Sequence, residues 1–215
     1  MKKRNFDLNF YKIIWLFILG SFIGWIVELL VYWIKYGKFM YFQGLVYGPF
    51  QPIYGLGVVI LAIIFSFYKK KKVLMSFLIG FFFFGIFEYF SSWFQEFFFG
   101  SYTWNYIGFF QVNLNGRVNL LYCVFFGLVA VIWARYVHER LLKFLERFNK
   151  GKWKYVTLVL TIFLVINVFL TCAVTKRKVD RFYEKPAQNS LERFVDKYYD
   201  NEFMQKWLPK VRVVK

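Results

Sequence analysis

Long runs of apolar side chains alternate with short polar segments through residues 1–174. Several runs approach or exceed the roughly 20 residues that an α-helix needs to cross a bilayer. The pattern predicts five transmembrane helices, at about residues 10–34, 52–68, 73–98, 118–136 and 155–174. A β-barrel would show short alternating segments instead of continuous apolar runs. We therefore expect an all-α fold, that of a polytopic helical membrane protein whose transmembrane domain occupies residues 1–174.

Residues 175–215 form a polar C-terminal tail with isolated apolar positions. Some of these positions recur at helical spacing and predict a short amphipathic helix: Leu191, Phe194, Val195 and Tyr198. A second helical piece is expected over residues 201–207, because Pro209 cannot continue a helix.

The stretch Gly44–Gly57, GLVYGPFQPIYGLG, separates the first two apolar runs. Hydrocarbon tolerates no unpaired backbone groups, so this stretch must lie at a membrane surface or inside the protein. Pro52 suits the first turn of the second helix, where its missing N–H costs nothing. We expect the stretch to be the lid or lining of a buried polar site, with four key positions: Gly48, Pro49, Pro52 and Gly55.

The first helix carries a stripe of small and acidic residues. Gly20, Gly24 and Glu28 are spaced four apart and share one helix face. The glycines would let another helix approach closely. Glu28 lies about 27 Å along the helix from Phe10, in the outer half if the N-terminus is inside. A carboxylate at that depth needs a proton or a partner, unless it reaches the interface by snorkelling.

A second polar stripe runs along the third helix, where Glu88, Ser92 and Glu96 are again spaced four apart. Glu88 lies about 22 Å from the lysine end of its helix, at nearly the depth expected for Glu28. Arg117 follows in the next loop and is a natural partner for one of these carboxylates, because a guanidinium can bind a carboxylate bidentately. Arg117 could equally serve as an interface anchor.

Composition supports a membrane protein. Of 215 residues, 59% are hydrophobic and 26% aromatic, more than a soluble domain of this size can cover with polar surface. The net charge of +17 is explained by basic loops that contact anionic lipid, so no nucleic-acid partner is expected. Cys123, Cys172 and His138 form neither a disulfide framework nor a metal pattern. We expect no metal and no cofactor.

The distribution of basic residues predicts the orientation. Fifteen Lys and Arg residues fall in the N-terminal segment up to Lys12, in the run Lys69–Lys72 and in residues 135–154, whereas the two opposite loops hold three. The positive-inside rule then places the N-terminus in the cytoplasm, and five crossings place the tail outside. The eleven basic residues of the tail oppose this assignment; a tail inside would mean that one predicted helix does not cross.

Three stretches together resemble the bacterial ABC-transporter type IV membrane proteins, which are often labelled ABC transporter permeases. They are Gly24–Glu28 followed by Gly44 and Gly48–Gly55; Glu88, Ser92 and Glu96 followed by Trp104–Tyr106; and Asn113–Arg117. They cover most of residues 20–147. The resemblance implies a multi-pass protein of the bacterial plasma membrane that works in transport. It leaves assembly as a homo- or hetero-oligomer open.

The chain departs from the family pattern at two positions, since Gln43 stands where the family usually has arginine and Gln51 where it often has cysteine. Arg117 is therefore expected to carry more of the charge compensation. The chain has no P-loop of the form GxxxxGK[ST], so an ATPase subunit would have to be a separate protein.

Three functions fit the sequence. In a transport component, the charged groups Glu28, Glu88, Glu96 and Arg117 would form a site in the outer half of the membrane, and Asn113, Asn115 and Tyr54 would supply hydrogen bonds. In a non-catalytic scaffold or sensor, the same charges would hold the structure together. In a membrane enzyme acting on lipid or cell-wall precursors, paired carboxylates would serve as acid and base. The sequence shows no nucleophile-plus-base motif, so we expect no enzymatic activity.

Overall fold

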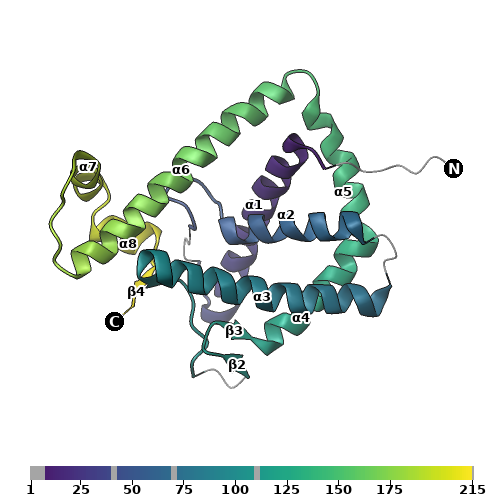
Figure 1. The fold of residues 1–215 in the computed structure, drawn as a ribbon, viewed down its shortest axis with the longest axis horizontal. Coiled ribbons are helices and arrows are strands. Elements are labelled where there is room, and N and C mark those ends of the chain that lie inside the picture. The colour runs from purple at the N-terminus through teal and green to yellow at the C-terminus, as the bar shows by residue number, and fades with distance from the viewer. Residues whose placement is uncertain (1–7, 40–42, 69–71, 109–111, 215) are drawn as a thin grey trace.

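The computed structural model describes residues 8–39, 43–68, 72–108 and 112–214, and most of these are helical. The basic residues Lys2–Arg4 and three lysines of the Lys69–Lys72 run lie outside the described residues. The helices up to residue 182 are α1 (Phe10–Tyr36), α2 (Pro52–Phe67), α3 (Val73–Phe99), α4 (Leu120–Ile132), α5 (His138–Leu145) and α6 (Trp153–Phe182). A π-helical turn, η1 (Trp133–Val137), joins α4 to α5, and a 3₁₀ turn, η2 (Glu146–Asn149), follows α5. The tail adds α7 (Ser190–Tyr198) and α8 (Asn201–Trp207) (Figure 1). Two short antiparallel strand pairs complete the fold: a hairpin of β2 (Asn113–Leu114) with β3 (Val118–Asn119), and a long-range pair of β1 (Ser101–Tyr102) with β4 (Arg212–Val213).

Four helical stretches of the described chain are long and apolar enough to cross a membrane: α1, α3, residues 120–149 and α6. The all-α, polytopic membrane fold expected from the sequence is therefore confirmed. α2 has 16 residues and is shorter than these spans. It begins beside the middle of α1, because the backbone N–H of Gln51, just before α2, donates to the carbonyl of Ser21.

Two helix boundaries differ from the pattern-based expectation for identifiable reasons. α4 starts at Leu120 because Val118 and Asn119 pair with the preceding strand, and the Asn119 side chain then caps the helix. α6 runs to Phe182, eight residues beyond the expected end at residue 174. Its last two turns are polar, and the tail covers them. The basic segment after α4 is a helical extension of it, joined through the π-turn η1.

Glycines bring the helices into close pairs. A Cβ built on Gly24 would lie 2.3 Å from the Tyr54 ring of α2, and one on Gly55 would lie 2.2 Å from the Ser21 hydroxyl of α1. On the other pair, a Cβ on Gly80 of α3 would lie 2.3 Å from Ala130 of α4. The close approach predicted from the glycine stripe of the first helix is thus present, and α2 is the helix that makes it.

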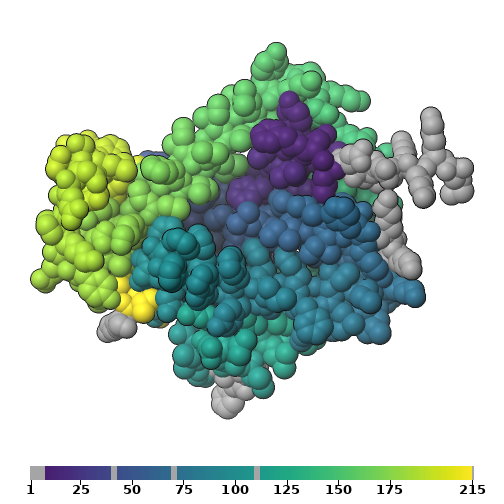
Figure 2. All heavy atoms as spheres, in the orientation of Figure 1, coloured from purple at the N-terminus to yellow at the C-terminus, as the bar shows by residue number. Residues whose placement is uncertain are grey.

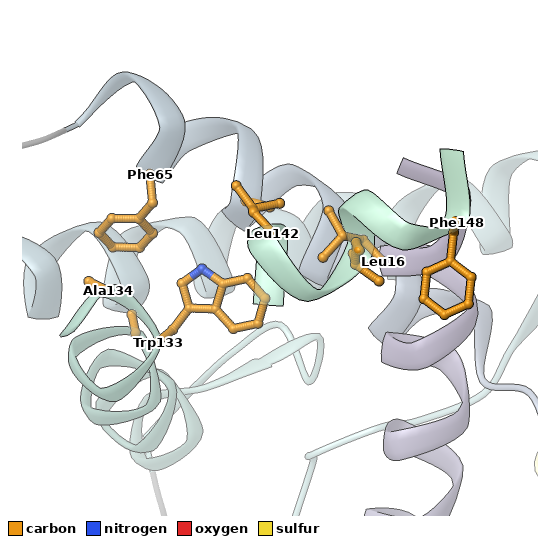
Figure 3. Packing of buried hydrophobic residues seen from close by; sticks show 9 residues of the cluster. Leu16, Phe65, Trp133, Ala134, Leu142 and Phe148 are labelled. Atoms are coloured by element: carbon orange, nitrogen blue, oxygen red, sulfur yellow. The ribbon is translucent and has the colours of Figure 1, made fainter. Parts of the chain in front are cut away.

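A hydrophobic core joins the helix ends at the end of the bundle where α1 begins. Figure 3 shows Phe65 of α2, Trp133 of η1 and Leu142 of α5 gathered with Leu16 of α1. The Trp15 ring stacks on Phe148 at 4.0 Å, which fastens the start of α1 to η2. This core fixes the end of the bundle opposite the polar groups described below.

The tail folds back onto the other end, which we call the tail side. A second apolar cluster there contains Val46, Val174, Val195, Tyr199, Met204 and Leu208, from the loop before α2, from α6 and from the tail. Figure 2 shows the yellow C-terminal residues against the teal end of α3, where β4 pairs with β1. The tail therefore lies on the same side as the two loops that are poor in Lys and Arg.

Candidate functional site

Glu28 of α1 is held by three side chains from distant parts of the chain. The Nε2 of Gln51 donates to Glu28 Oε2 at 2.9 Å, and the Nζ of Lys210 donates to the same oxygen at 2.5 Å. The Tyr54 hydroxyl, from the first turn of α2, also bonds the Glu28 carboxylate. The Glu28 side chain is 18% exposed. A partly buried carboxylate with an ammonium partner is far less costly at membrane depth than an unpaired one.

Arg117 forms the second ion pair. Its Nη2 donates to Glu96 Oε2 at 2.6 Å and its Nη1 to the Ser92 hydroxyl at 3.2 Å, so Arg117 spans one turn of α3. The guanidinium carbon also lies 5.8 Å from the centre of the Tyr89 ring. Because the Arg117 side chain is 18% exposed, this pair is partly shielded from water. Among the alternatives left open by the sequence, the structure selects Glu96 as its partner.

Glu88 lies between these pairs and is 6% exposed. The Tyr106 hydroxyl donates to Glu88 Oε1 at 2.6 Å, and the backbone N–H of Asn119 also bonds the carboxylate. Its Oε2 is buried and has no hydrogen-bond partner among the described residues. Burial and the nearby Glu88 raise the pKa of Tyr106 well above its usual value, so the phenol keeps its proton and acts as a donor. Tyr54 lies close enough to interact electrostatically with both Glu88 and Glu28.

The segment just before α2 bonds to α6 through Val46 and Tyr47. The Asn167 side chain of α6 bonds both the N–H and the carbonyl of Tyr47, at 3.1 and 2.6 Å, and the Thr171 hydroxyl accepts from the N–H of Val46. Gly48 has a φ of 81°, which permits the tight turn in which its carbonyl accepts from the Phe50 N–H. These backbone polar groups of Val46, Tyr47, Gly48 and Phe50 thus find partners inside the protein, as hydrocarbon requires.

Of the four positions predicted to form the lid, Pro52 and Gly55 lie in the first turn of α2, beside α1. Pro49 directly follows Gly48 in the turn. Gln51, which the sequence reasoning treated as a departure from the family pattern, connects this loop to Glu28. The loop therefore lies against the Glu28 end of the polar cluster.

Asn113 and Asn115 belong to the hairpin between β2 and β3. The Asn113 side-chain NH₂ donates to the Tyr106 carbonyl, and the Asn113 side-chain oxygen accepts from the Gly116 N–H. This side chain therefore connects the segment around Tyr106 to the β2–β3 hairpin. Asn115 and Gly116 both have positive φ, 52° and 70°, and are the two central residues of the turn in which the Arg117 N–H donates to the Leu114 carbonyl. Asn115 lines a polar pocket of about 140 Å³ with Ser92, Glu96 and Arg117.

The structure therefore gathers the predicted residues into two ion pairs flanking one buried carboxylate. Arg117 compensates the charge of Glu96, and Lys210 of the tail, which the sequence analysis did not name, compensates that of Glu28. Sequence reasoning also missed Tyr106 and Asn167. A lone Asn in an otherwise apolar helix was the available signal for Asn167, since such a side chain needs a partner in the membrane.

Residues 15–172 match the family model described as "Putative ABC-transporter type IV". The chain belongs to this family. No similar protein was found among curated proteins, and no similar fold among solved structures. The match includes Glu28, Glu88, Glu96 and Arg117 and ends before Lys210. Family membership and the apolar helices together support a multi-pass component of a membrane transport system.

Proposed function

We propose that this chain is the permease component of an ABC-type transporter and that its Glu/Arg cluster is the polar site through which an ion or solute passes. The observation that carries the proposal is Glu88, a carboxyl group in a membrane helix with one oxygen left without a partner in the described part of the chain. A buried polar group without a partner is costly, so such groups in membrane proteins tend to mark pathways and relays.

The cluster has the parts that such a site needs. Glu88 is flanked by the hydroxyls of Tyr54 and Tyr106, and the two outer carboxylates are already neutralised by Lys210 and Arg117. An incoming proton or cation would therefore meet Glu88 as the carboxyl group that lacks a basic partner. The loop of residues 43–51 and the tail cover the site from the tail side.

The energy source would be a separate ATPase subunit, since the chain carries no P-loop. Its docking surface would be the basic segment after α4. This segment carries Arg140, Lys143 and Arg147, and its apolar residues belong to the hydrophobic core at the N-terminal end of the bundle. With this end in the bacterial cytoplasm, the tail lies outside the plasma membrane. Anionic lipid would contact the same basic residues.

The test is passive proton flux in proteoliposomes that hold the purified protein and a trapped pH-sensitive dye, where an imposed pH gradient supplies the driving force in place of the ATPase subunit. Glu88→Gln should reduce the protein-dependent flux at least tenfold, and Glu202→Gln, in an exposed part of α8, should leave it unchanged. Equal flux with the parent and Glu88→Gln would reject the cluster as a pathway. In that case the charged pairs only stabilise the fold, as in a scaffold or sensor.

The lid is tested separately. A Pro49→Ala, Pro52→Ala double variant should still insert into the membrane, because its apolar helices are unchanged, but should lose most of the flux. Normal flux in the double variant would reduce the loop to a connector between α1 and α2.

A further inference from the structure

An apolar groove lies on the surface of α3 next to the β2–β3 hairpin and α4. Its volume is about 550 Å³, within the range of small-molecule sites. Phe82, Ile86 and Phe90 form its outer wall and are 59, 69 and 57% exposed. Gly85 forms its floor, where a Cβ would lie 3.3 Å from the Cys123 sulfur of α4. Because α3 and α4 belong to membrane spans, this groove opens toward lipid.

The groove and the polar pocket of Arg117 follow one another along α3. The groove extends from Phe81 to Phe90, and the polar pocket from Ser92 to Glu96. At 1.5 Å per residue, the groove covers about 14 Å of the helix in the middle and tail-side part of the span, and the pocket comes next toward the membrane surface. Moving from the membrane centre to its surface, a ligand would meet first apolar and then charged groups.

Two features join the groove and the pocket into one surface. Tyr89 lines the groove and its ring lies under the Arg117 guanidinium, which lines the pocket. The β2–β3 hairpin borders both, with Leu114 and Val118 on the groove and Asn115 on the pocket. The sequence of surfaces matches an amphiphile whose chain lies in the groove and whose head reaches the pocket.

We propose that this surface binds a zwitterionic phospholipid of the tail-side leaflet, with an acyl chain in the groove and the head group at Arg117 and Glu96. The two charged side chains are 2.6 Å apart, so the pocket offers a cation and an anion side by side. A phosphate can bind Arg117 while an amine binds Glu96, whereas a purely anionic head would also face the Glu96 carboxylate. A second copy of the chain would fill the groove but supplies no reason for the charged end. This site shares Arg117 and Glu96 with the polar cluster of the proposed function, but lipid binding there does not require transport.

The experiment uses the purified full-length protein in nanodiscs that contain phosphatidylethanolamine with a photoactivatable diazirine on one acyl chain. Cross-linked peptides should map to residues 81–90 and 112–123. Gly85→Leu fills the floor of the groove and should lower the cross-linked fraction at least fivefold. The matched control Val159→Leu, on the lipid-facing side of α6, should not change it. Unchanged helix content and elution volume show that Gly85→Leu folds, and Gly85→Ala provides a milder second variant.

The head group is tested by competition. Unlabelled phosphatidylethanolamine should displace the probe at least fivefold more effectively than phosphatidylglycerol, and Arg117→Gln combined with Glu96→Gln should abolish this difference. Cross-links spread evenly over all lipid-facing helices would overturn the site. So would the absence of cross-links to residues 81–90, or a preference for phosphatidylglycerol. Flux is not part of the readout, so failure of the transport proposal leaves this result interpretable.

Discussion

The Nζ of Lys210 lies 2.5 Å from the Oε2 of Glu28, although 182 positions separate the two residues in the chain. This contact connects the last residues of the tail to the middle part of the first membrane helix. β4 pairs with β1 nearby, and the Lys178 Nζ donates to the Val211 carbonyl at 2.5 Å, so the residues directly after Lys210 are attached as well. The polar tail is therefore part of the membrane-domain structure.

Removal of the lysine should weaken the fold. We expect Lys210→Met to lower the free energy of unfolding by about 1–3 kcal/mol, below the cost for a fully buried pair because Lys210 is one third exposed. The loss should shrink when Glu28→Gln is added, because no unpaired carboxylate is then left. Thermal unfolding of the two single variants and the double variant in detergent measures the coupling. Strictly additive effects would show that the two charges do not interact.

Asn167 should be essential for the conformation of the loop before α2. Asn167→Leu leaves the N–H and carbonyl of Tyr47 without partners inside the bundle, at a cost of about 2–4 kcal/mol. The control is Thr161→Val, because the Thr161 hydroxyl bonds the Thr157 carbonyl of its own helix and holds no other segment. Unfolding temperature and proteolysis within residues 43–51 provide the readout. Equal stability of the two variants would contradict the assigned role.

Attachment of the tail should weaken in acid through Asp196. Burial acts to raise the pKa of Asp196, but hydrogen bonds from Arg177 and Arg181 outweigh it, and the pKa lies below its ordinary value of 3.8. A carboxyl with a lowered pKa contributes stability above that ordinary value and loses it as the pH falls through the folded-state pKa. The hydrogen-exchange protection factors of residues 190–208, which correct for the intrinsic pH dependence of exchange, should therefore fall below about pH 4.

The variant Asp196→Asn isolates this effect from other carboxyl groups. Its tail should exchange faster at neutral pH, and the exchange should change less between pH 5 and pH 3 than in the parent. If both proteins show the same pH dependence, other groups control the release of the tail.

The α1–α2 contact should be destabilised by the addition of a single methyl group. Gly24→Ala places a Cβ 2.3 Å from the Tyr54 ring and should destabilise the protein by about 1–3 kcal/mol. It should also displace Tyr54 from Glu28. Gly57→Ala is the matched control on α2, because its Cβ would make an ordinary 3.5 Å contact with Phe87. Similar unfolding temperatures for the two variants would show that the helices separate easily.

At high pH the tail has a second sensitive contact. The hydroxyls of Tyr47 and Tyr199 lie 2.7 Å apart, and burial together with this bond raises the pKa of Tyr199 to about 12. A raised pKa of this acid means that the contribution to stability is complete below pH 10 and is lost as the pH rises toward 12. Tyr199→Phe should remove that alkaline loss, which tyrosinate absorbance and tail proteolysis can follow. An unchanged alkaline profile would contradict the pairing.

Several properties follow from the order of residues alone. Continuous apolar runs dictate membrane helices, because the bilayer accepts no other open backbone arrangement. The four-residue spacing of Gly20, Gly24 and Glu28 places them on one face, and the Pro/Gly content of residues 44–51 disfavours a regular helix before Pro52. Each of these conclusions concerns neighbours within one segment.

The tertiary structure decided which groups meet. It paired Glu28 with Lys210 and Glu96 with Arg117, left one oxygen of Glu88 without a described partner, and seated the loop before α2 on Asn167 of α6. It also placed the start of α2 beside the middle of α1, where the Gln51 N–H donates to the Ser21 carbonyl. Spacing along one helix fixes which side chains share its face, but a partner from another segment is set by how the helices pack, and that depends on close contacts such as those of Gly24 and Gly55.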